Sequence, residues 1–401
     1  MKEEKSVAFC FVAESHGLLF CVKRKNMKTI VISAVNLVEG GAYTILRECL
    51  LALSKLNIEN RYKIVALVNN HTDLNFENIE FVDFPKAKKN WVYRIYYEYC
   101  GFKKLSKQLK PYLWLSLHDI TPNVLATVRA VYCHNPTPFY KAKKSDFRHS
   151  YKLVLFSFFY KYLYRINIKK NNFVIVQQKW IKEAFVHNYD LHGEQVLVAY
   201  PNTKTAVVEV GSSTISDNKK SKKTFFYPSL SRTFKNFEFV CEAVKVLNAQ
   251  AVEGFEVLLT LDGMEDSYAS WVVNKYKDVD NIKFIGLIPY SKMADCYRKT
   301  DCLIFPSRLE TWGLPISEFA QYDKPMLLID LPYAHETSIG AKYVDYFNAE
   351  SCRDLAQKME NVIKGDLSQF KMQERNNIDG VFVENFAELF SVLLKETSKN
   401  N

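Results

Sequence analysis

Two glutamates eight residues apart have the types and the spacing for chemistry on a polar ligand. Glu310 and Glu318 flank the sequence TWGLPIS, which follows the apolar run Cys302–Phe305 and opens a segment of helical pattern near Pro315. Loops after parallel strands form the ligand-binding edge of a sheet, so we expect both carboxylates at one cleft, with Glu318 in the first turn of the helix. Gly313 permits close backbone approach, and a helix start favours an anion such as a pyrophosphate. The alternative is a solvated loop glutamate and a carboxylate that only stabilises the helix start.

Two cations follow an earlier strand of the same half. Arg232 and Lys235 come directly after the run Thr224–Tyr227, and a guanidinium and an ammonium there can neutralise a diphosphate without a metal. The alternative is that Lys235 is an ordinary surface lysine. Asp278 and Asp280 precede their strand rather than follow it, and no His/Cys cluster has zinc spacing, so we predict no metal site.

The first half offers weaker candidates at the same edge of its own expected sheet. Gly40 and Gly41 follow the first strand, where they could approach a phosphate or another substrate closely, although such pairs often serve only the turn. His118 and His134 end two later strands, and Asp119 could fix the tautomer of a histidine ring. Each histidine could equally be a structural residue.

Strands and amphipathic helices alternate along most of the chain, a pattern that predicts an α/β protein with parallel sheets. In the first half the expected strands are 29–34, 62–68, 79–82, 112–117, 130–133, 173–177 and 195–199. In the second half they are 224–227, 255–261, 282–285, 302–305 and 325–329.

The 401 residues suggest two domains, and 48% hydrophobic with 24% charged residues exclude a mainly disordered or fibrous chain. We expect a disordered extension over 1–26, Rossmann-like domains over 27–202 and 224–365, a Ser-, Thr- and Lys-rich linker over 203–223, and C-terminal helices over 366–401 that pack back on the first domain. Nine cysteines without a CxxC pair indicate reduced thiols in a cytosolic compartment.

Positive charge is concentrated in one half. Residues 1–200 hold 30 Lys and Arg against 16 Asp and Glu, whereas the remainder holds 24 against 28. The basic and aromatic segment 139–170 could lie on an anionic membrane or bind an acceptor, although a core helix with a solvated basic face fits equally. Nucleic acid is not expected because no recognised module accompanies the charge. The residues of this patch are Lys141, Lys143, Lys144 and Arg148.

The Glu-x7-Glu segment, with its Trp-Gly-Leu-Pro interior, resembles the retaining GT-B glycosyltransferases of family 4. The resemblance implies two Rossmann-like domains facing each other across a cleft. It implies that Glu318 binds the donor ribose and that Glu310 acts at the transferred sugar. From its place at a strand end, His134 is a further catalytic candidate that could orient the acceptor or its sugar. The resemblance also implies a donor site made by Arg232, Lys235, the backbone amides of Trp312, Gly313 and Leu314, and the glycine loop at Gly40 and Gly41. His118 and Asp119 would lie on the acceptor side.

The implied function is metal-independent, retaining transfer of a sugar from a nucleotide diphosphate sugar to a lipid-linked or polysaccharide acceptor in cell-surface glycan synthesis. No cofactor is expected, and the location would be the cytoplasm, peripheral on the inner face of the membrane. The alternatives are a catalytically inactive scaffold of the same fold and a nucleotide-sugar epimerase.

Overall fold

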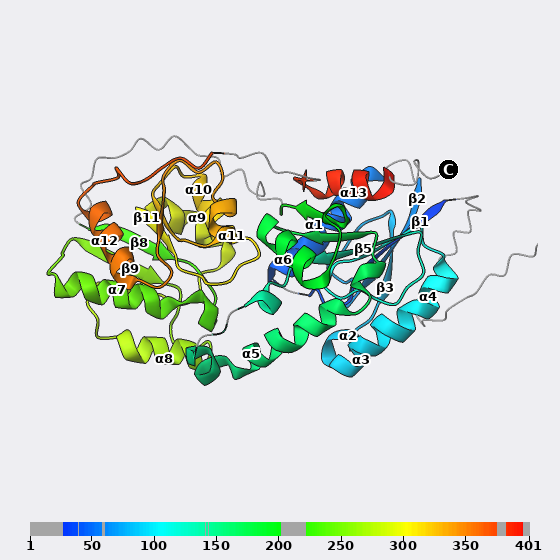
Figure 1. Ribbon diagram of the computed structural model, residues 1–401, viewed down its shortest axis with the longest axis horizontal. Coiled ribbons are helices and arrows are strands. Elements are labelled where there is room, and N and C mark those ends of the chain that lie inside the picture. The colour runs from blue at the N-terminus through cyan, green and yellow to red at the C-terminus, as the bar shows by residue number, and fades with distance from the viewer. Residues whose placement is uncertain are drawn as a thin grey trace, which may run out of the picture.

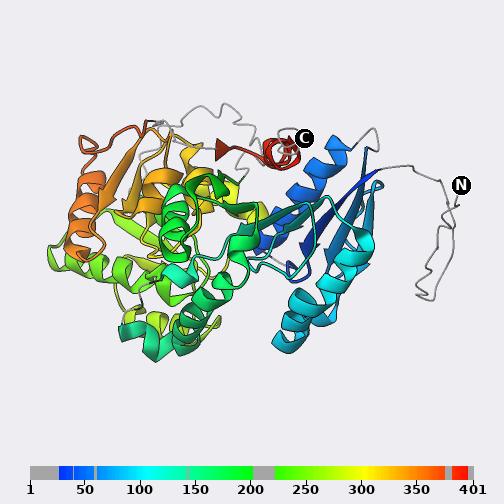
Figure 2. The same cartoon turned by 45° about the vertical axis from the view of Figure 1, so that its right-hand side comes forward.

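Two parallel sheets account for the architecture of the chain (Figures 1 and 2). The computed structural model describes residues 27–38, 40–57, 61–140, 142, 144–201, 222–374 and 382–395. The expected extension over 1–26, most of the expected linker, Lys141 and Lys143 lie outside these residues. The α/β class that alternating strands and helices predict is confirmed.

The first sheet has eight strands, all parallel, in the order β14-β7-β6-β5-β4-β1-β2-β3. The order reverses between β1 and β4, and such a switch point opens a crevice at the carboxyl ends of the strands. The strands are β1 (Lys28–Ala34), β2 (Tyr62–Val68), β3 (Ile79–Asp83), β4 (Leu113–Ser116), β5 (Val128–Cys133), β6 (Phe173–Val176), β7 (Val196–Ala199) and β14 (Phe382–Val383).

Both faces of this sheet are buried because successive strand residues point to opposite sides. In β5, Ala130 and Tyr132 join the core under α1 and α13, whereas Val131 and Cys133 join the core under α5 and α6. The helices are α1 (Gly40–Leu56), α2 (Lys86–Lys89), α3 (Trp91–Tyr96), η1 (Tyr97–Gly101), α4 (Phe102–Leu109), η2 (Thr137–Phe139), α5 (Lys144–Arg165), η3 (Ile168–Lys170), α6 (Lys179–Tyr189), η4 (Gly193–Gln195) and α13 (Phe386–Lys395).

The second sheet has six parallel strands in the order β10-β9-β8-β11-β12-β13, with its switch point between β8 and β11. The strands are β8 (Lys223–Tyr227), β9 (Phe255–Leu259), β10 (Ile282–Phe284), β11 (Cys302–Phe305), β12 (Met326–Ile329) and β13 (Val344–Phe347). The helices are η5 (Thr233–Lys235), α7 (Phe237–Ala249), α8 (Ser267–Tyr276), α9 (Tyr290–Lys299), α10 (Leu314–Ala320), α11 (Pro332–Thr337) and α12 (Cys352–Ile363).

After the second sheet the chain returns to the first. β14 pairs with β7, and the amide of Tyr200 donates to the carbonyl of Val383 at 3.1 Å. Phe390 and Leu393 of α13 are completely buried in the core that α1 covers. The pattern after Asp366 predicts two helices, but the described part of this tail contains a strand and one helix, and residues 366–374 are not helical.

A buried polar cluster anchors α3 and η1 to the edge of the first sheet. The Arg94 guanidinium donates to Glu98 at 2.8 Å and to Nδ1 of His118 at 3.0 Å. Because an arginine only donates, Nδ1 accepts and the ring proton lies on Nε2, 3.0 Å from Oγ of Ser33 and 3.3 Å from Glu98. Burial raises the pKa of Glu98 to about 7, and burial together with the Arg94 charge holds the pKa of His118 well below its usual range.

Truncating Phe390 tests whether α13 completes the first domain. Phe390→Ala should lower the free energy of unfolding by about 3–5 kcal/mol, because it removes a buried ring and leaves a cavity. We expect hydrogen-exchange protection to fall in α1 and β7 but not in β8–β12. Val392→Ala, at a partly buried site of the same helix, should cost less. Equal losses in both domains would contradict a first-domain role for α13.

Glu98 should make stability depend on pH in a defined direction. A carboxyl whose pKa is higher in the folded state than in the unfolded state stabilises the folded state when the pH is below the unfolded-state pKa. This stabilisation is lost as the pH rises through the folded-state pKa. The unfolding free energy of the parent, relative to Glu98→Gln, should therefore fall between about pH 4.5 and pH 7 and level off above. Urea titrations across that range measure it. A difference that is constant with pH would refute the raised pKa.

Candidate active site

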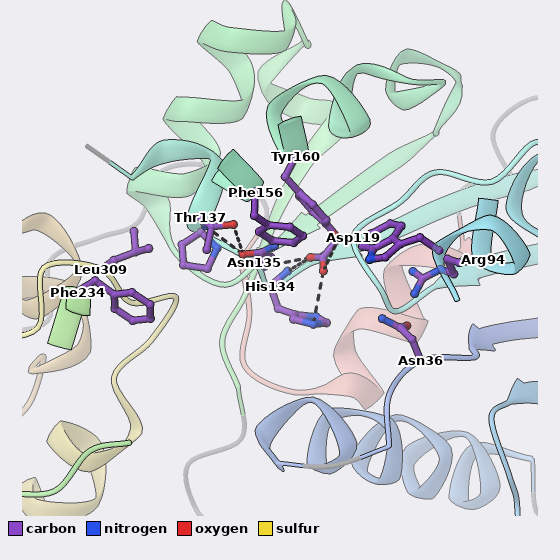
Figure 3. A pocket seen from close by; sticks show the side chains of 12 residues that line it. Asn36, Arg94, Asp119, His134, Asn135, Thr137, Phe156, Tyr160, Phe234 and Leu309 are labelled. Carbon is purple, nitrogen blue, oxygen red and sulfur yellow. Dashed lines mark hydrogen bonds and ion pairs between the residues drawn. The ribbon is translucent and has the colours of Figure 1, made fainter. Parts of the chain in front are cut away.

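The carboxyl ends of the two sheets meet around one cavity. It has a volume of about 390 Å³ and takes residues from the loops after β1, β4 and β5 of the first sheet. From the second sheet it takes Phe234 and Leu309, the chain neighbours of Lys235 and Glu310. Figure 3 shows these two side chains across the cavity from His134 and Asn135. The lining residues are Asn36, Trp91, Arg94, Asp119, His134, Asn135, Pro136, Thr137, Phe156, Tyr160, Phe234 and Leu309.

Lys235 and Glu310 form an ion pair where β8 and β11 end, beside the cavity. Lys235 closes the single turn η5, and Glu310 lies on the loop that links β11 to α10. Their side chains are 16% and 13% exposed, so the pair is partly shielded from water but reachable. A cation and a carboxylate in contact can separate when a ligand offers the lysine an anion.

The loop after Glu310 presents unused backbone donors. Gly313 has φ of 89°, and a β-carbon there would lie 3.3 Å from Cδ1 of Ile316, so only glycine fits without strain. Within the described residues, no hydrogen bond leaves the amides of Trp312, Gly313 or Leu314. The Trp312 indole is fixed by donating to Oγ of Ser317 at 2.8 Å. These amides can therefore donate hydrogen bonds to an oxygen of a ligand.

Glu318 is the fifth residue of α10, one turn later than expected, because the helix begins at Leu314. Tyr297 donates to its Oε2 at 2.7 Å. Burial raises the pKa of Tyr297, and the neighbouring Glu318 charge raises it further, as it does for Tyr290. Two tyrosines of α9 thus hold the carboxylate beside the loop that carries Glu310.

Arg232 is more exposed than Lys235 and lies near Asp266 rather than Glu310. Its guanidinium donates to the carbonyl of Ser231 at 2.7 Å and lies 3.8 Å from Asp266, with 57% of the side chain exposed. Arg308, which the sequence did not single out, is the buried arginine of this region.

Asp119 is a structural anchor rather than an open acceptor contact. Its φ of 72° is one that aspartate tolerates, and its Oδ1 accepts from the amides of His134 and Asn135 at 2.8 and 3.0 Å. Tyr164 of α5 donates to the same oxygen at 2.9 Å. The carboxylate is 6% exposed, so its main effect is to fix the loop after β5.

His134 is the predicted histidine that reaches the cavity. Its side chain is 17% exposed and its Nε2 lies 3.7 Å from Oδ2 of Asp119. Its Nδ1 is buried without a partner, as is Oδ1 of Asn36 on the same cavity (Figure 3). Two buried polar atoms without partners fit a cavity that takes a polar ligand.

The assignment of His118 to the acceptor side is wrong. Its side chain has no exposed surface, because Arg94, Glu98 and Ser33 enclose it. Gly40 and Gly41 form the first turn of α1 rather than a loop, and a β-carbon on Gly41 would meet no atom within 4 Å. The space around Gly41 therefore does not require glycine, and the helical position of both residues gives the expected loop role no support.

A buried ion pair joins the two domains beside the cavity. Arg308, on the loop after β11, lies 3.0 Å from Asp146 at the start of α5, and their side chains are 8% and 0% exposed. Tyr140 donates to the same aspartate at 2.7 Å. Asp146 is the only acidic residue between Lys141 and Lys182, and that isolation was the signal in the sequence for its role.

A second contact closes the other side of the domain interface. Glu336 of α11 accepts from the amide of Lys179 at the start of α6 at 2.8 Å and from the Tyr200 hydroxyl at 2.8 Å. Gln178 donates to Thr337 at 2.8 Å. Carboxylate capping of a helix start by the opposite domain fixes α6 against α11.

The remaining predicted features have simple placements. Asp278 and Asp280 lie in an exposed turn before β10, and the described residues contain no group of three or more His, Cys, Asp or Glu suited to a metal. Lys144 and Arg148 belong to α5. In the part of the chain that the structure covers, no helix is both long and apolar enough to cross a bilayer.

Comparison with known proteins agrees with this geometry. Residues 213–378 match the family described as glycosyl transferases group 1. The O-antigen chain mannosyltransferase RfbU of Salmonella typhimurium is 21% identical over 208 residues, which are 51% of this chain and 55% of that protein. The chain therefore aligns with about half the length of this relative.

Solved structures match over almost the whole chain. A glycosyltransferase from Rickettsia africae has a TM-score of 0.59 and 15% identity, covering 94% of this chain and 100% of the other. HepE of Anabaena, solved with UDP and glucose, has a TM-score of 0.53 and 12% identity, covering 93% and 98%. These neighbours confirm the predicted GT-B fold. The chain thus has the two-domain fold of GT-B glycosyltransferases, and its second domain is similar to the glycosyl transferases group 1 family.

Proposed function

We propose that the chain is a metal-independent, retaining glycosyltransferase of the family 4 type that moves a hexose from a nucleotide diphosphate sugar to a lipid-linked or polysaccharide acceptor. The observation that carries the proposal is the Lys235–Glu310 pair, whose chain neighbours Phe234 and Leu309 line the cavity shared by the domains. The HepE neighbour holds UDP and glucose, and RfbU acts on an O-antigen chain, which favours the same substrate classes here.

On the donor side, the second domain supplies the groups that a nucleotide diphosphate requires. Lys235 can leave Glu310 to pair with the diphosphate, and the Trp312–Leu314 amides can donate to it or to the sugar. Glu318 has one oxygen committed to Tyr297, and its other oxygen can accept from a ribose hydroxyl. Arg232 is an outer cation that could approach the phosphates by leaving Asp266.

In the transfer step, the bond between the anomeric carbon and the diphosphate oxygen breaks and the acceptor oxygen bonds to the same carbon on the same face. The acceptor proton leaves on the departing phosphate oxygen, so no external base is required. Glu310, released from Lys235, would stabilise positive charge at the anomeric carbon. His134, whose side chain lines the cavity and is 17% exposed, would hold a sugar hydroxyl.

On the acceptor side, the cavity offers a polar floor and an apolar rim. Asn36, Arg94 and Thr137 provide hydrogen-bonding groups, whereas Trp91 and Phe156 provide apolar surface. Such a mixture suits a glycan carried on a lipid. Together with the basic surplus of the first half, it favours a place on the cytoplasmic face of a membrane.

Neither alternative has equal support. An inactive scaffold would have no use for an intact Lys235–Glu310 pair beside an open cavity. An epimerase requires an acid and a base at one sugar carbon, and the acidic side chain that lines the cavity, Asp119, is already committed to the amides of His134 and Asn135.

Substitution of the two glutamates should separate catalysis from donor binding. Glu310→Gln should lower kcat more than donor affinity, because its interaction strengthens as charge develops. Glu318→Ala should weaken donor binding by about 1.5–3 kcal/mol, because ribose loses a charged acceptor. The donor is first found by screening nucleotide sugars for thermal stabilisation. Glu253→Gln, at an exposed position, is the control. Full activity in Glu310→Gln would reject its role, and unchanged affinity in Glu318→Ala would remove that residue from the site.

Activity should also survive chelation. If Lys235 and the backbone amides neutralise the leaving diphosphate, dialysis against EDTA should leave the rate of sugar transfer unchanged. Lys235→Ala should abolish most of the activity under the same conditions. A loss with EDTA that Mg²⁺ or Mn²⁺ restores would show that a metal, rather than Lys235, balances the charge.

A further inference from the structure

Large apolar side chains gather on two helices of the first domain. Of the 26 exposed residues of this kind in the described part of the chain, twelve belong to α3 and α5. The two helices lie along the same edge of the molecule, the lower edge in Figures 1 and 2. Contiguous apolar surface on a folded chain marks an interaction site.

Five of the seven exposed apolar residues of α5, together with Ile166 just after the helix, form one stripe. From Tyr151 to Ile166 they recur at spacings of three and four, so at 3.6 residues per turn they fall within an arc of about 100°. The side chains of Phe158 and Phe159 are 59% and 60% exposed. The stripe comprises Tyr151, Leu155, Phe158, Phe159, Tyr162 and Ile166.

The opposite side of α5 faces inward and carries hydroxyl groups. Tyr160 and Tyr164 are buried and donate to Asp119 at 3.5 and 2.9 Å, and Ser157 is buried beside them. These hydrogen bonds fix the rotation of the helix. The aromatic stripe is therefore held outward by the packing and is not a mobile apolar face that could turn into the core.

Helix α3 extends the same surface to the cavity. Val92 is 71% exposed, and the Trp91 ring lies 6.5 Å from the Phe156 ring of α5. Trp91 and Phe156 also line the cavity, so the apolar surface continues to its mouth. The Arg94–Glu98–His118 cluster anchors α3 to the first sheet.

Exposed cations on α2 and α5 border the aromatic surface. Lys86, Lys88 and Lys89 of α2 lie immediately before α3, and Lys161 and Arg165 flank the stripe on α5. Aromatic side chains with cations at their margin fit the boundary between lipid headgroups and acyl chains of an anionic bilayer.

We infer that α2, α3 and the outer stripe of α5 form a docking surface for an anionic lipid bilayer, and that a lipid-linked acceptor reaches the cavity between Trp91 and Phe156. This inference rests on the proposed function, which needs such an acceptor at the cavity. It assigns the contact to the aromatic stripe and α2. Lys141 and Lys143 of the patch predicted from the sequence lie outside the described residues.

Sedimentation with liposomes of phosphatidylglycerol and phosphatidylcholine tests the surface. Phe158→Ser with Phe159→Ser should lower the partition coefficient about tenfold or more, because two exposed aromatics leave the lipid boundary. Lys86→Glu with Lys88→Glu and Lys89→Glu should reduce it to the level of the parent in high salt. Met264→Ser with Met372→Ser removes two apolar residues of the second domain that are 86% and 62% exposed and should change nothing.

Three further readouts decide between the possible outcomes. Normal sedimentation of the Phe158/Phe159 variant, or a parent that fails to bind anionic vesicles at low salt, would overturn the inference. A parent dimer that the same variant converts to monomer would assign the stripe to a second copy of the chain and also overturn it. Donor binding and transfer to a soluble acceptor should stay at parental levels in the variant, so failure of the docking surface is distinguishable from failure of the proposed function.

Discussion

The position of the active site depends on one buried ion pair between the domains. Arg308 comes from the loop after β11 that also carries Glu310, and Asp146 comes from the first turn of α5. Removing one partner of a buried pair leaves an uncompensated charge and costs about 3–5 kcal/mol. Tyr140 and the carbonyl of Thr233 take up further hydrogen bonds of the pair. The pair therefore fixes the loop with Glu310 relative to the helix that walls the cavity.

Helix α5 connects that ion pair to the part of the cavity that the first domain forms. The helix is kinked at Ser150, where φ is −151°, and then runs along the cavity with Phe156 and Tyr160 on its wall. Its inward tyrosines end at Asp119, whose carboxylate also holds the amides of His134 and Asn135. Asp146 at the start of α5 and Asp119 near its end thus fix the position of the helix. Asp119 also fixes the position of His134.

The sequence was sufficient to predict most strands and to bring Lys235 and Glu310 to the same edge of the second sheet. Short β-branched runs such as 62–68 are unambiguous, and Glu310 with Lys235 could be placed because parallel strands put their following loops at one edge. The sequence did not predict β14, because a strand of two residues shows no periodicity. These residues acquire strand geometry only by pairing with β7. Position after a strand could not separate His118 from His134. What separates them is the Arg94–Glu98 pair of α3 and η1, which lies 24 and 20 residues before His118 and encloses only that histidine.

The path of the chain makes the second domain an insertion in the first. Residues 222–374 lie between the strand β7 and its neighbour β14, so the first domain is assembled from two distant pieces of sequence. A fragment that stops after Ala199 would leave β7 as a bare edge, with unpaired N–H and C=O groups that invite strand addition from other chains. During synthesis, the whole second domain must therefore emerge from the ribosome before β14 can pair with β7 and complete the sheet of the first domain.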